Sequence, residues 1–328
     1  MQIIGGIAFG LGGLVLAAAG GLALRFHLGR RRADRIWAAD RYPKLEDVGT
    51  VKNLAILPLI DRHVAHEGLR GEAGVSYLIR AGGTTILFDV GLNGQREHPS
   101  PLLCNMEALG VHLEEVDYVV ISHCHLDHVG GLAYQLRRTF GLSGEPQDLS
   151  GVTALVPEPM THPSARVEGV ERPRVIAPGI ASIGPIARQL FFFGWTPEQS
   201  LAINVEGKGI VLVVGCGHST LERIVERTEM LFDEPLYGLV GGLHYPVTSS
   251  REGMLGRPVQ GILGTGKWPW RAIDEKDVEA SIAFLKRRHP HLVALSPHDS
   301  SEWSIEAFRR AFEGGYRDVR VGEEIFVG

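Results

Sequence analysis

The sequence predicts a layered α/β domain preceded by one N-terminal transmembrane helix. Residues 3–24 carry no charged side chain, and a helix of this length would rise about 33 Å, enough to cross a bilayer's hydrocarbon core. From residue 51 onward, short apolar runs typical of strands alternate with segments of helical periodicity. Several of these runs end in histidine, as expected when the strands of a layered fold direct their ends at one site.

The charge pattern around the first segment predicts its orientation. Five arginines follow at once, whereas nothing before the segment is basic: Arg25, Arg30, Arg31, Arg32 and Arg35. The positive-inside bias then predicts a single-pass membrane protein with a cytoplasmic C-terminal domain. The alternative is export after signal-peptide cleavage, although a signal peptide normally has a basic start and a shorter apolar core. We expect a membrane anchor over residues 1–28, a juxtamembrane linker over 29–50 and one domain over 51–328.

Composition limits the classes of partner. Of the 328 residues, 44% are hydrophobic and 22% are charged, which is ordinary for a globular protein. The formal net charge of -5 leaves no basic footprint, so we expect no nucleic-acid partner. The three cysteines are odd in number and scattered, which indicates reduced thiols rather than a disulfide framework.

The first half of the domain is predicted to alternate strands and helices. Strands are expected at residues 54–57, 75–79 and 84–88, the last two joined by a Gly82-Gly83 turn, and then at 118–121 and 152–156. Helices are expected at 101–110 and 132–138. Asp89 ends the third strand, where its carboxylate either supports a nearby site or caps the turn.

The second half of the domain is also predicted to combine strands and helices. Strands are expected at residues 201–205 and 210–214, followed by a helix at 220–231. A strand at 239–244 ends in His244. After a helix at 277–288, a strand at 292–298 ends in His298.

One short motif dominates the chain. Residues 123–128 have the sequence HCHLDH, after the apolar strand and before Gly130-Gly131. Neutral imidazoles and a carboxylate suit Zn²⁺ and its neighbours, and a tight loop can turn His123 and His125 toward one ion while Asp127 and His128 face a second. A histidine-rich surface turn is the alternative, but the strand and the glycines favour a fixed loop.

Other residues are less clear from the sequence alone. Cys216 is either a ligand or an apolar filler, and His244 is either a ligand or a substrate contact, whereas His298 is expected to bind metal. Residues 191–193 are three phenylalanines expected in the core, and the glycine-rich segment 253–271 is either a lid or a surface loop pinned by two tryptophans. Seven histidines are expected on the surface: His63, His66, His98, His112, His162, His289 and His291.

These motifs, in order, resemble the metallo-β-lactamase superfamily. HCHLDH matches its HxHxDH signature, and FDVGLNG, TPEQSLAI, GCGH, GGLH and a late strand ending in histidine also match. The pattern is most similar to the dihydropterin-ribofuranosyl-aminobenzene-phosphate-synthase-like branch. The resemblance implies a four-layer αββα sandwich over residues 51–328.

The sequence departs from the wider family at two places. Many members have a third histidine ligand in an HTxGS-like segment, where this chain has Trp195 to Ser200. The carboxylate that often bridges two metals is replaced by Cys216, whose thiolate can still bind Zn²⁺. His218 follows closely and could restore the lost imidazole. The resemblance therefore implies one or two Zn²⁺ ions, with Mn²⁺ or Fe²⁺ possible.

The resemblance implies a membrane-anchored metal-dependent hydrolase, or a related enzyme, that uses a metal-bound hydroxide on a small-molecule substrate. Asp127 would bind metal and orient the hydroxide, and His244 is the second candidate catalytic residue. The implied ligands are His123, His125, Asp127, His128, Cys216, His218 and His298. The alternative is a noncatalytic membrane-tethered metal-binding or sensor module. Because the imidazole of His218 would replace the missing family ligand, His218→Ala should lower metal content more than Cys216→Ser.

Overall fold

A computed structural model describes residues 2–247 and 264–328, with side chains of the first helix described from residue 17 onward. The helices are α1 (Gln2–Ala39), α2 (Pro101–Ala108), α3 (Leu132–Arg137), α4 (Leu221–Leu231), α6 (Glu275–Lys286) and α7 (Glu302–Ala311), with a 3₁₀ turn at Leu113–Glu115. The strands of the first sheet are β1 (Leu54–Ile60), β2 (Ser76–Ala81), β3 (Thr84–Phe88), β4 (Tyr118–Val120), β5 (Thr153–Val156), β6 (Arg166–Gly169) and β15 (Ile325–Val327). The strands of the second sheet are β7 (Arg174–Ala177), β8 (Ile180–Ser182), β11 (Leu201–Val205), β12 (Gly209–Val214), β13 (Leu236–Gly241) and β14 (Leu292–Leu295). A hairpin of β9 (Ile186–Leu190) and β10 (Gly194–Glu198) stands apart from both.

The two sheets combine antiparallel and parallel pairing. The first has the order β15-β1-β2-β3-β4-β5-β6 and the second the order β14-β13-β12-β11-β8-β7. In the first, β3, β4, β5 and β6 run parallel; in the second, β12, β13 and β14 do. The carboxyl ends of parallel strands meet at one edge of a sheet, so the loops after β4, β12, β13 and β14 are brought to the same region.

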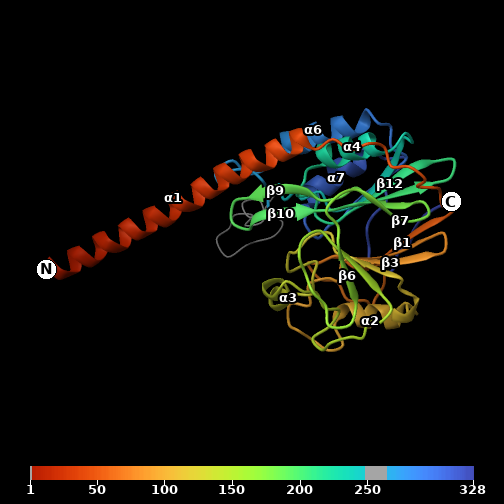
Figure 1. The fold of residues 1–328 in the computed structure, drawn as a ribbon, viewed down its shortest axis with the longest axis horizontal. Coiled ribbons are helices and arrows are strands. Elements are labelled where there is room, and N and C mark those ends of the chain that lie inside the picture. Colours follow the sequence, from red (N-terminus) through yellow and green to blue (C-terminus); the bar gives the residue numbers. More distant parts are fainter. Residues whose placement is uncertain (1, 248–263) are drawn as a thin grey trace.

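The hydrophobic core consists of three clusters, one between the two facing sheets and one on the outer face of each sheet. Ile56, Phe88, Ile203 and Val213 belong to a cluster between the sheets. The outer face of the second sheet packs on α4, α6 and α7, and the outer face of the first packs on α2 and the loops around it. Figure 1 shows the helices outside the paired sheets, so the predicted layered α/β domain is present.

The predicted membrane span is wrong. In the part of the chain that the structure describes, no helix is both long and apolar enough to cross a membrane. The predicted single-pass topology, with a cytoplasmic catalytic domain, therefore loses its basis.

The charged half of α1 packs on the domain. The helix continues to Ala39, through the arginine cluster and into the segment predicted as a linker, 29–50. Its arginines contact the domain: Arg25 Nη2 donates to the carbonyls of Phe191 and Phe192, and the Arg32 guanidinium lies 4.6 Å from the ring centre of Trp195. Figure 1 shows this half of α1 lying along β9, β10 and α4.

Buried polar and aromatic contacts join α1 to the domain. The ring of Phe26 is fully buried, with its centre 5.2 Å from that of Phe191 and 4.8 Å from that of Trp268. Just after the helix, Asp40 accepts a 3.0 Å hydrogen bond from the fully buried guanidinium of Arg227. The second half of α1 thus packs as an element of the fold.

Two further predictions differ from the structure. Phe191 is buried, but Phe192 and Phe193 are each 44% exposed on the β9–β10 turn, so the aromatic run is only partly core. Residues 253–263 of the predicted lid lie outside the described residues. In its described remainder, Trp268 stacks on Trp270, which is 71% exposed.

Candidate metal centre

The HCHLDH loop follows β4 and is held rigidly. Ile121 N donates to Leu155 O, and Ser122 O accepts from Gln199 N, which ties the start of the loop to β5 and to the connection between β10 and β11. The glycines after the motif are required: Gly130 has φ +89, and a Cβ there would lie 2.0 Å from Gly141 O. His123 is fully buried, so the predicted fixed loop is confirmed over a surface turn.

One group of potential ligands combines three chain segments. The donor atoms of Asp127, His128, Cys216 and His298 all lie within 4.8 Å of one another. Cys216 Sγ is 3.0 Å from His128 Nε2 and 3.2 Å from His298 Nε2, and Asp127 Oδ2 is 3.7 Å from His128 Nε2. These N, O and S donors match the ligands of a tetrahedral Zn²⁺ site.

A second group shares the same thiol. His123, Cys216 and His218 form it, again with donor atoms within 4.8 Å. His218 Nδ1 lies 2.8 Å from the carbonyl of Gly264, which acts as the acceptor and so orients the ring. Its Nε2 is buried and has no hydrogen-bond partner among the described residues. An orphaned imidazole nitrogen in a cluster of ligand atoms is what a metal site requires when no ion is bound.

A third group contains a residue that the sequence analysis did not identify. Cys216, His244 and Asp299 have donor atoms within 4.8 Å, and Asp299 Oδ2 accepts a 2.9 Å hydrogen bond from His244 N. Asp299 follows His298 directly. Its position after the end of a predicted strand could have identified it as a candidate site residue. Both alternatives for His244, ligand and substrate contact, agree with this position.

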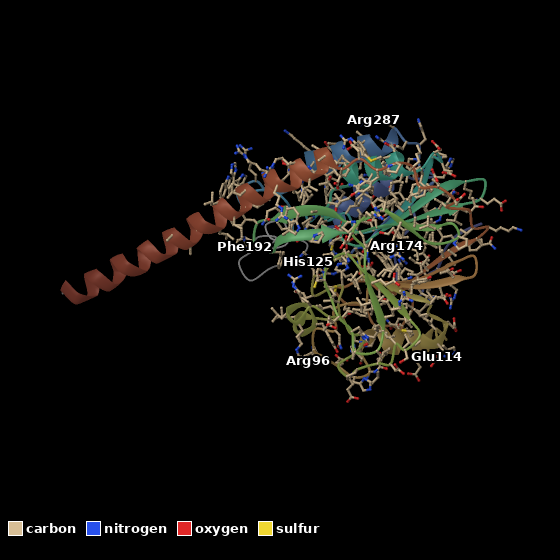
Figure 2. The ribbon with its side chains drawn as sticks, in the orientation of Figure 1. Arg96, Glu114, His125, Arg174, Phe192 and Arg287 are labelled. Carbon is tan, nitrogen blue, oxygen red and sulfur yellow. The ribbon has the colours of Figure 1, made fainter. Side chains whose placement is uncertain are left out.

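His125 lies beside these groups but belongs to none of them. Its Nδ1 is 3.0 Å from His123 Nε2, and its Nε2 is 3.5 Å from Thr196 Oγ1. Thr196, rather than the neighbouring Trp195, faces the imidazole. In Figure 2, His125 lies near Phe192, on the side of the domain where the β9–β10 turn projects.

Two buried relays orient the ligands. Asp89 Oδ2 accepts a 2.7 Å hydrogen bond from His128 Nδ1, so of the two alternatives for Asp89 the structure shows support of the site. Ser296 Oγ lies 2.6 Å from His298 Nδ1 and donates to Asp61, which also accepts from the Tyr77 hydroxyl. Carboxylate–histidine relays of this kind fix the tautomer and raise the basicity of metal-binding imidazoles.

Glu198 is a second residue that the sequence analysis did not identify, and it holds the thiol-bearing turn. Its Oε1 accepts hydrogen bonds from Cys216 N at 2.9 Å and Gly217 N at 2.8 Å. The carboxyl group is buried, and this burial raises its pKa. Glu198 therefore positions Cys216 through the backbone.

Three of the imidazoles are held neutral, which favours metal binding, whereas His128 must release a proton to bind a metal. Burial and neighbouring histidines lower the pKa of His123 and His218 well below the usual value, and burial lowers the pKa of His125 to about 4. These rings are therefore neutral, as a ligand must be. Burial also opposes the charged form of His128, but Asp89 and Asp127 outweigh it and raise its pKa to about 9.

Burial raises the pKa of the Cys216 thiol well above its ordinary range, with further contributions from Asp127 and Asp299. A thiol in this setting becomes a thiolate only when a cation compensates its charge, and a coordinating metal does so outright. The donor set and the orphaned Nε2 of His218 thus fit a divalent metal.

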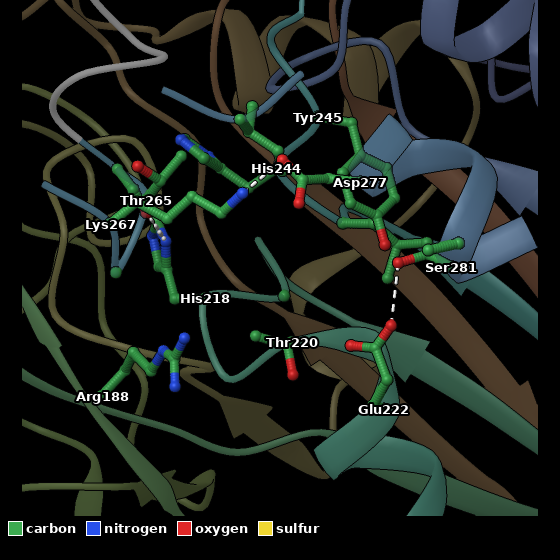
Figure 3. A pocket seen from close by; sticks show the side chains of 16 residues that line it. Arg188, His218, Thr220, Glu222, His244, Tyr245, Thr265, Lys267, Asp277 and Ser281 are labelled. Carbon is green, nitrogen blue, oxygen red and sulfur yellow. Dashed lines mark hydrogen bonds and ion pairs between the residues drawn. The ribbon is translucent and has the colours of Figure 1, made fainter. Parts of the chain in front are cut away.

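A cavity of about 240 Å³ adjoins the second and third groups. His218, His244, Leu243 and Tyr245 form part of its wall, together with residues of β9, α4 and α6. Figure 3 shows Arg188 and His218 among the lining side chains, with the His218 ring turned toward the segment that carries Gly264 and Thr265. The cavity therefore borders the ligand cluster at His218 and His244.

Removal of the Asp89 carboxylate should destabilise the domain. Asp89→Ala leaves His128 without its buried acceptor and Ser122 N without its 2.7 Å partner, so we expect the free energy of unfolding to fall by about 3 kcal/mol. Urea denaturation of the metal-free protein measures this loss. Asp148→Ala, at an exposed carboxylate, is the control; equal stability of the two variants would contradict the assigned role of Asp89.

Comparisons with known proteins agree with this geometry. Residues 69–151, which include the HCHLDH loop, match the family model of the metallo-beta-lactamase superfamily. A 7,8-dihydropterin-6-methyl-4-(beta-D-ribofuranosyl)-aminobenzene-5'-phosphate synthase of Methanocaldococcus jannaschii is 25% identical over 242 residues, covering 61% of this chain and 80% of that protein. The anti-Pycsar protein Apyc1 of a Paenibacillus species is 40% identical over 70 residues, covering 21% of this chain and 25% of that one.

A solved structure shares the fold. The crystal structure of Tm1679, described as a metal-dependent hydrolase of the beta-lactamase superfamily, has a TM-score of 0.55 and 20% identity, and the match covers 83% of this chain and 98% of that one. The motif, the two-sheet core and these matches lead to one conclusion. The chain has the metallo-β-lactamase fold, and its segment 69–151 matches the model of that superfamily.

Proposed function

We propose that this protein is a di-metal hydrolase that acts on a small-molecule substrate. The observation that carries the proposal is the convergence on one thiol of donor groups from the HCHLDH loop, the turn after β12 and the loops after β13 and β14. His123, His218 and Cys216 would hold one ion, and Asp127, His128, His298 and Cys216 the other. Zn²⁺ suits this mixture of imidazole, carboxylate and thiolate, and Mn²⁺ or Fe²⁺ is a less favoured occupant.

Bound metal would supply Lewis-acid polarisation and lower the pKa of water near neutrality. The chain itself supplies the remaining chemistry. Asp127 is the only carboxylate of the first group, and its side chain is 28% exposed. It is placed to orient a water molecule and accept its proton. His244, on the cavity wall, contacts the substrate or completes the ligand set.

Side-chain nucleophiles near the loop are poorly suited to attack. Ser122 Oγ is buried and donates a 2.7 Å hydrogen bond to Asp89. Cys124 packs in the outer core of the first sheet, where burial and then Glu158 raise its pKa to about 11. A thiol with this pKa is protonated at neutral pH and is a weak nucleophile, so we infer a mechanism without an acyl-enzyme intermediate.

The noncatalytic metal-binding module is the competing proposal. Its basis in the sequence is the replacement of two family ligands, at Trp195 and Cys216. The positions of Cys216 and His218 weaken that basis, because the thiol lies among the ligands of both groups and the imidazole joins one of them.

Turnover by the zinc-loaded full chain tests the proposal. The substrate panel consists of esters, lactones and phosphoesters; the M. jannaschii relative is named as a synthase of a ribofuranosyl phosphate compound, which is why phosphoesters are included. We expect turnover of at least one class, loss on chelation and recovery with Zn²⁺ or Mn²⁺. Full metal loading without turnover of any class would favour the noncatalytic module, and activity in metal-free protein would refute the proposed chemistry.

A further inference from the structure

Arg188 is a cation in the cavity without a carboxylate partner among the described residues. It lies on β9 and lines the cavity beside His218 and His244. In the described part of the chain it forms no ion pair, and its buried Nε has no hydrogen-bond partner. A guanidinium in a cavity wall normally has an anionic partner, because an unpaired buried charge is costly.

The position of Arg188 is set by close packing on the segment 264–266. A Cβ on Gly266 would lie 2.6 Å from Arg188 Nε, and a Cβ on Gly264 would lie 2.0 Å from His244 Nε2. Arg188 and His244 thus pack on the two ends of a three-residue segment, whose end-to-end span is at most about 7 Å. One small molecule can therefore reach the guanidinium and the metal centre together.

The other charged groups of the cavity have hydrogen-bonding partners of their own, and the carboxylates of Glu222 and Asp34 act on Arg188 only at a distance, without an ion pair. Lys267 is ion-paired with Asp277, and Glu222 accepts a 2.9 Å hydrogen bond from Ser281 Oγ. Figure 3 shows both pairs separated from the guanidinium of Arg188. Burial and then Arg223 lower the pKa of Arg188 to about 10, so it still carries its charge at neutral pH.

We propose that Arg188 binds an anionic group, a phosphate or a carboxylate, on the substrate whose reacting bond lies at the metal centre. The planar guanidinium can donate two parallel hydrogen bonds to either oxyanion, which positions the substrate as well as attracting it. The proposal rests on the proposed function for the identity of the ligand as a substrate, but the binding site itself rests on Arg188 and its cavity.

Calorimetric titration of the zinc-loaded full chain with inorganic phosphate, and separately with acetate, tests the site. We expect Arg188→Gln to weaken binding of at least one anion by about 10- to 100-fold, the effect of losing charge-assisted hydrogen bonds. The anion that shows the larger loss identifies the class. Any contact of phosphate with metal is common to wild type and variant, so the ratio of their dissociation constants isolates the contribution of Arg188.

Matched variants separate a binding role from misfolding. Arg188→Lys keeps the positive charge but loses the planar set of guanidinium donors. Its affinity for the anion should lie between those of wild type and Arg188→Gln. Gly266→Ala should weaken binding by displacing the guanidinium, whereas Arg80→Gln, at a surface ion pair with Glu115, should leave it unchanged.

The result that would overturn the inference is equal affinity of wild type and Arg188→Gln for both anions, or no binding of either by wild type. Both outcomes are independent of turnover. If the panel gives no turnover but phosphate binding depends on Arg188, the hydrolase proposal fails and the anion site stands. If neutral esters are turned over but Arg188→Gln has no effect on anion binding, the anion site fails and the hydrolase proposal stands.

Discussion

Cys216→Ala is expected to weaken metal binding at both ligand groups by more than about 100-fold, since loss of an orienting residue alone commonly costs about 10- to 100-fold. The thiol is the one side chain shared by both groups, so its removal takes a ligand from each ion. Dialysis against buffered Zn²⁺, followed by mass-spectrometric determination of metal per chain, measures the loss.

His218→Ala and Cys124→Ala are the comparison and the control. His218 belongs to one group, so its removal should spare the ion held by Asp127, His128 and His298. This order is the reverse of the one expected from the sequence, in which His218 was expected to matter more than Cys216. Cys124 is a buried thiol outside the site, and its replacement should leave metal content unchanged. A Cys216→Ala protein with the metal content of wild type would refute the bridging role.

Asp127→Ala is expected to lower kcat by about 10²- to 10⁴-fold, the usual contribution of a positioned proton acceptor. Its side chain is partly exposed at the centre, whereas its backbone carbonyl accepts a 3.1 Å hydrogen bond from Val75 N, so truncation removes the carboxylate without removing that tie. Turnover at saturating Zn²⁺ measures the effect on the substrate found in the panel.

Two further measurements make this result interpretable. The free energy of unfolding of Asp127→Ala should stay close to that of wild type, and the surface variant Asp148→Ala should retain full activity. An Asp127→Ala enzyme with wild-type kcat at saturating Zn²⁺ would exclude Asp127 from the chemistry and leave His244 as the remaining candidate.

The strands nearest the site could be predicted because their composition is simple. Residues 84–88, 201–205 and 210–214 are short, mostly apolar runs that contain β-branched residues, and each is a strand with those bounds to within one residue. Strands β6 to β10 were not predicted. The sequence of β6, RVEG, is short and mostly polar, and pairing with β5 alone determines its conformation.

The candidate ligands could be recognised from local sequence, whereas their supporting residues could not. HCHLDH places four donors in six residues, and the later donors follow strand ends. Glu198 acts on Cys216, 18 positions away, and Asp61 accepts a hydrogen bond from Ser296, 235 positions away. Ser296 in turn contacts His298, two positions on. No local sequence pattern marks these supporting residues. Arg188 is similar, because its role depends on a cavity formed by other elements.

The N-terminal prediction failed for a related reason. Hydropathy of residues 3–24 was considered separately from the arginines that follow, which were assigned to a membrane flank. In the structure those arginines lie on the same helix, where Arg25 contacts the β9–β10 turn and Arg32 contacts Trp195 of β10. Tertiary contact, rather than local composition, determines the role of this charged half.

Anomalous diffraction from crystals of the zinc-loaded full chain, recorded at the zinc edge, tests the metal centre most directly. We expect two peaks, one among His123, His218 and Cys216 and the other among Asp127, His128, His298 and Cys216, with Cys216 Sγ at coordination distance from both. A single peak that Cys216 does not contact, or no peak within the cluster at full zinc loading, would contradict the proposed di-metal centre.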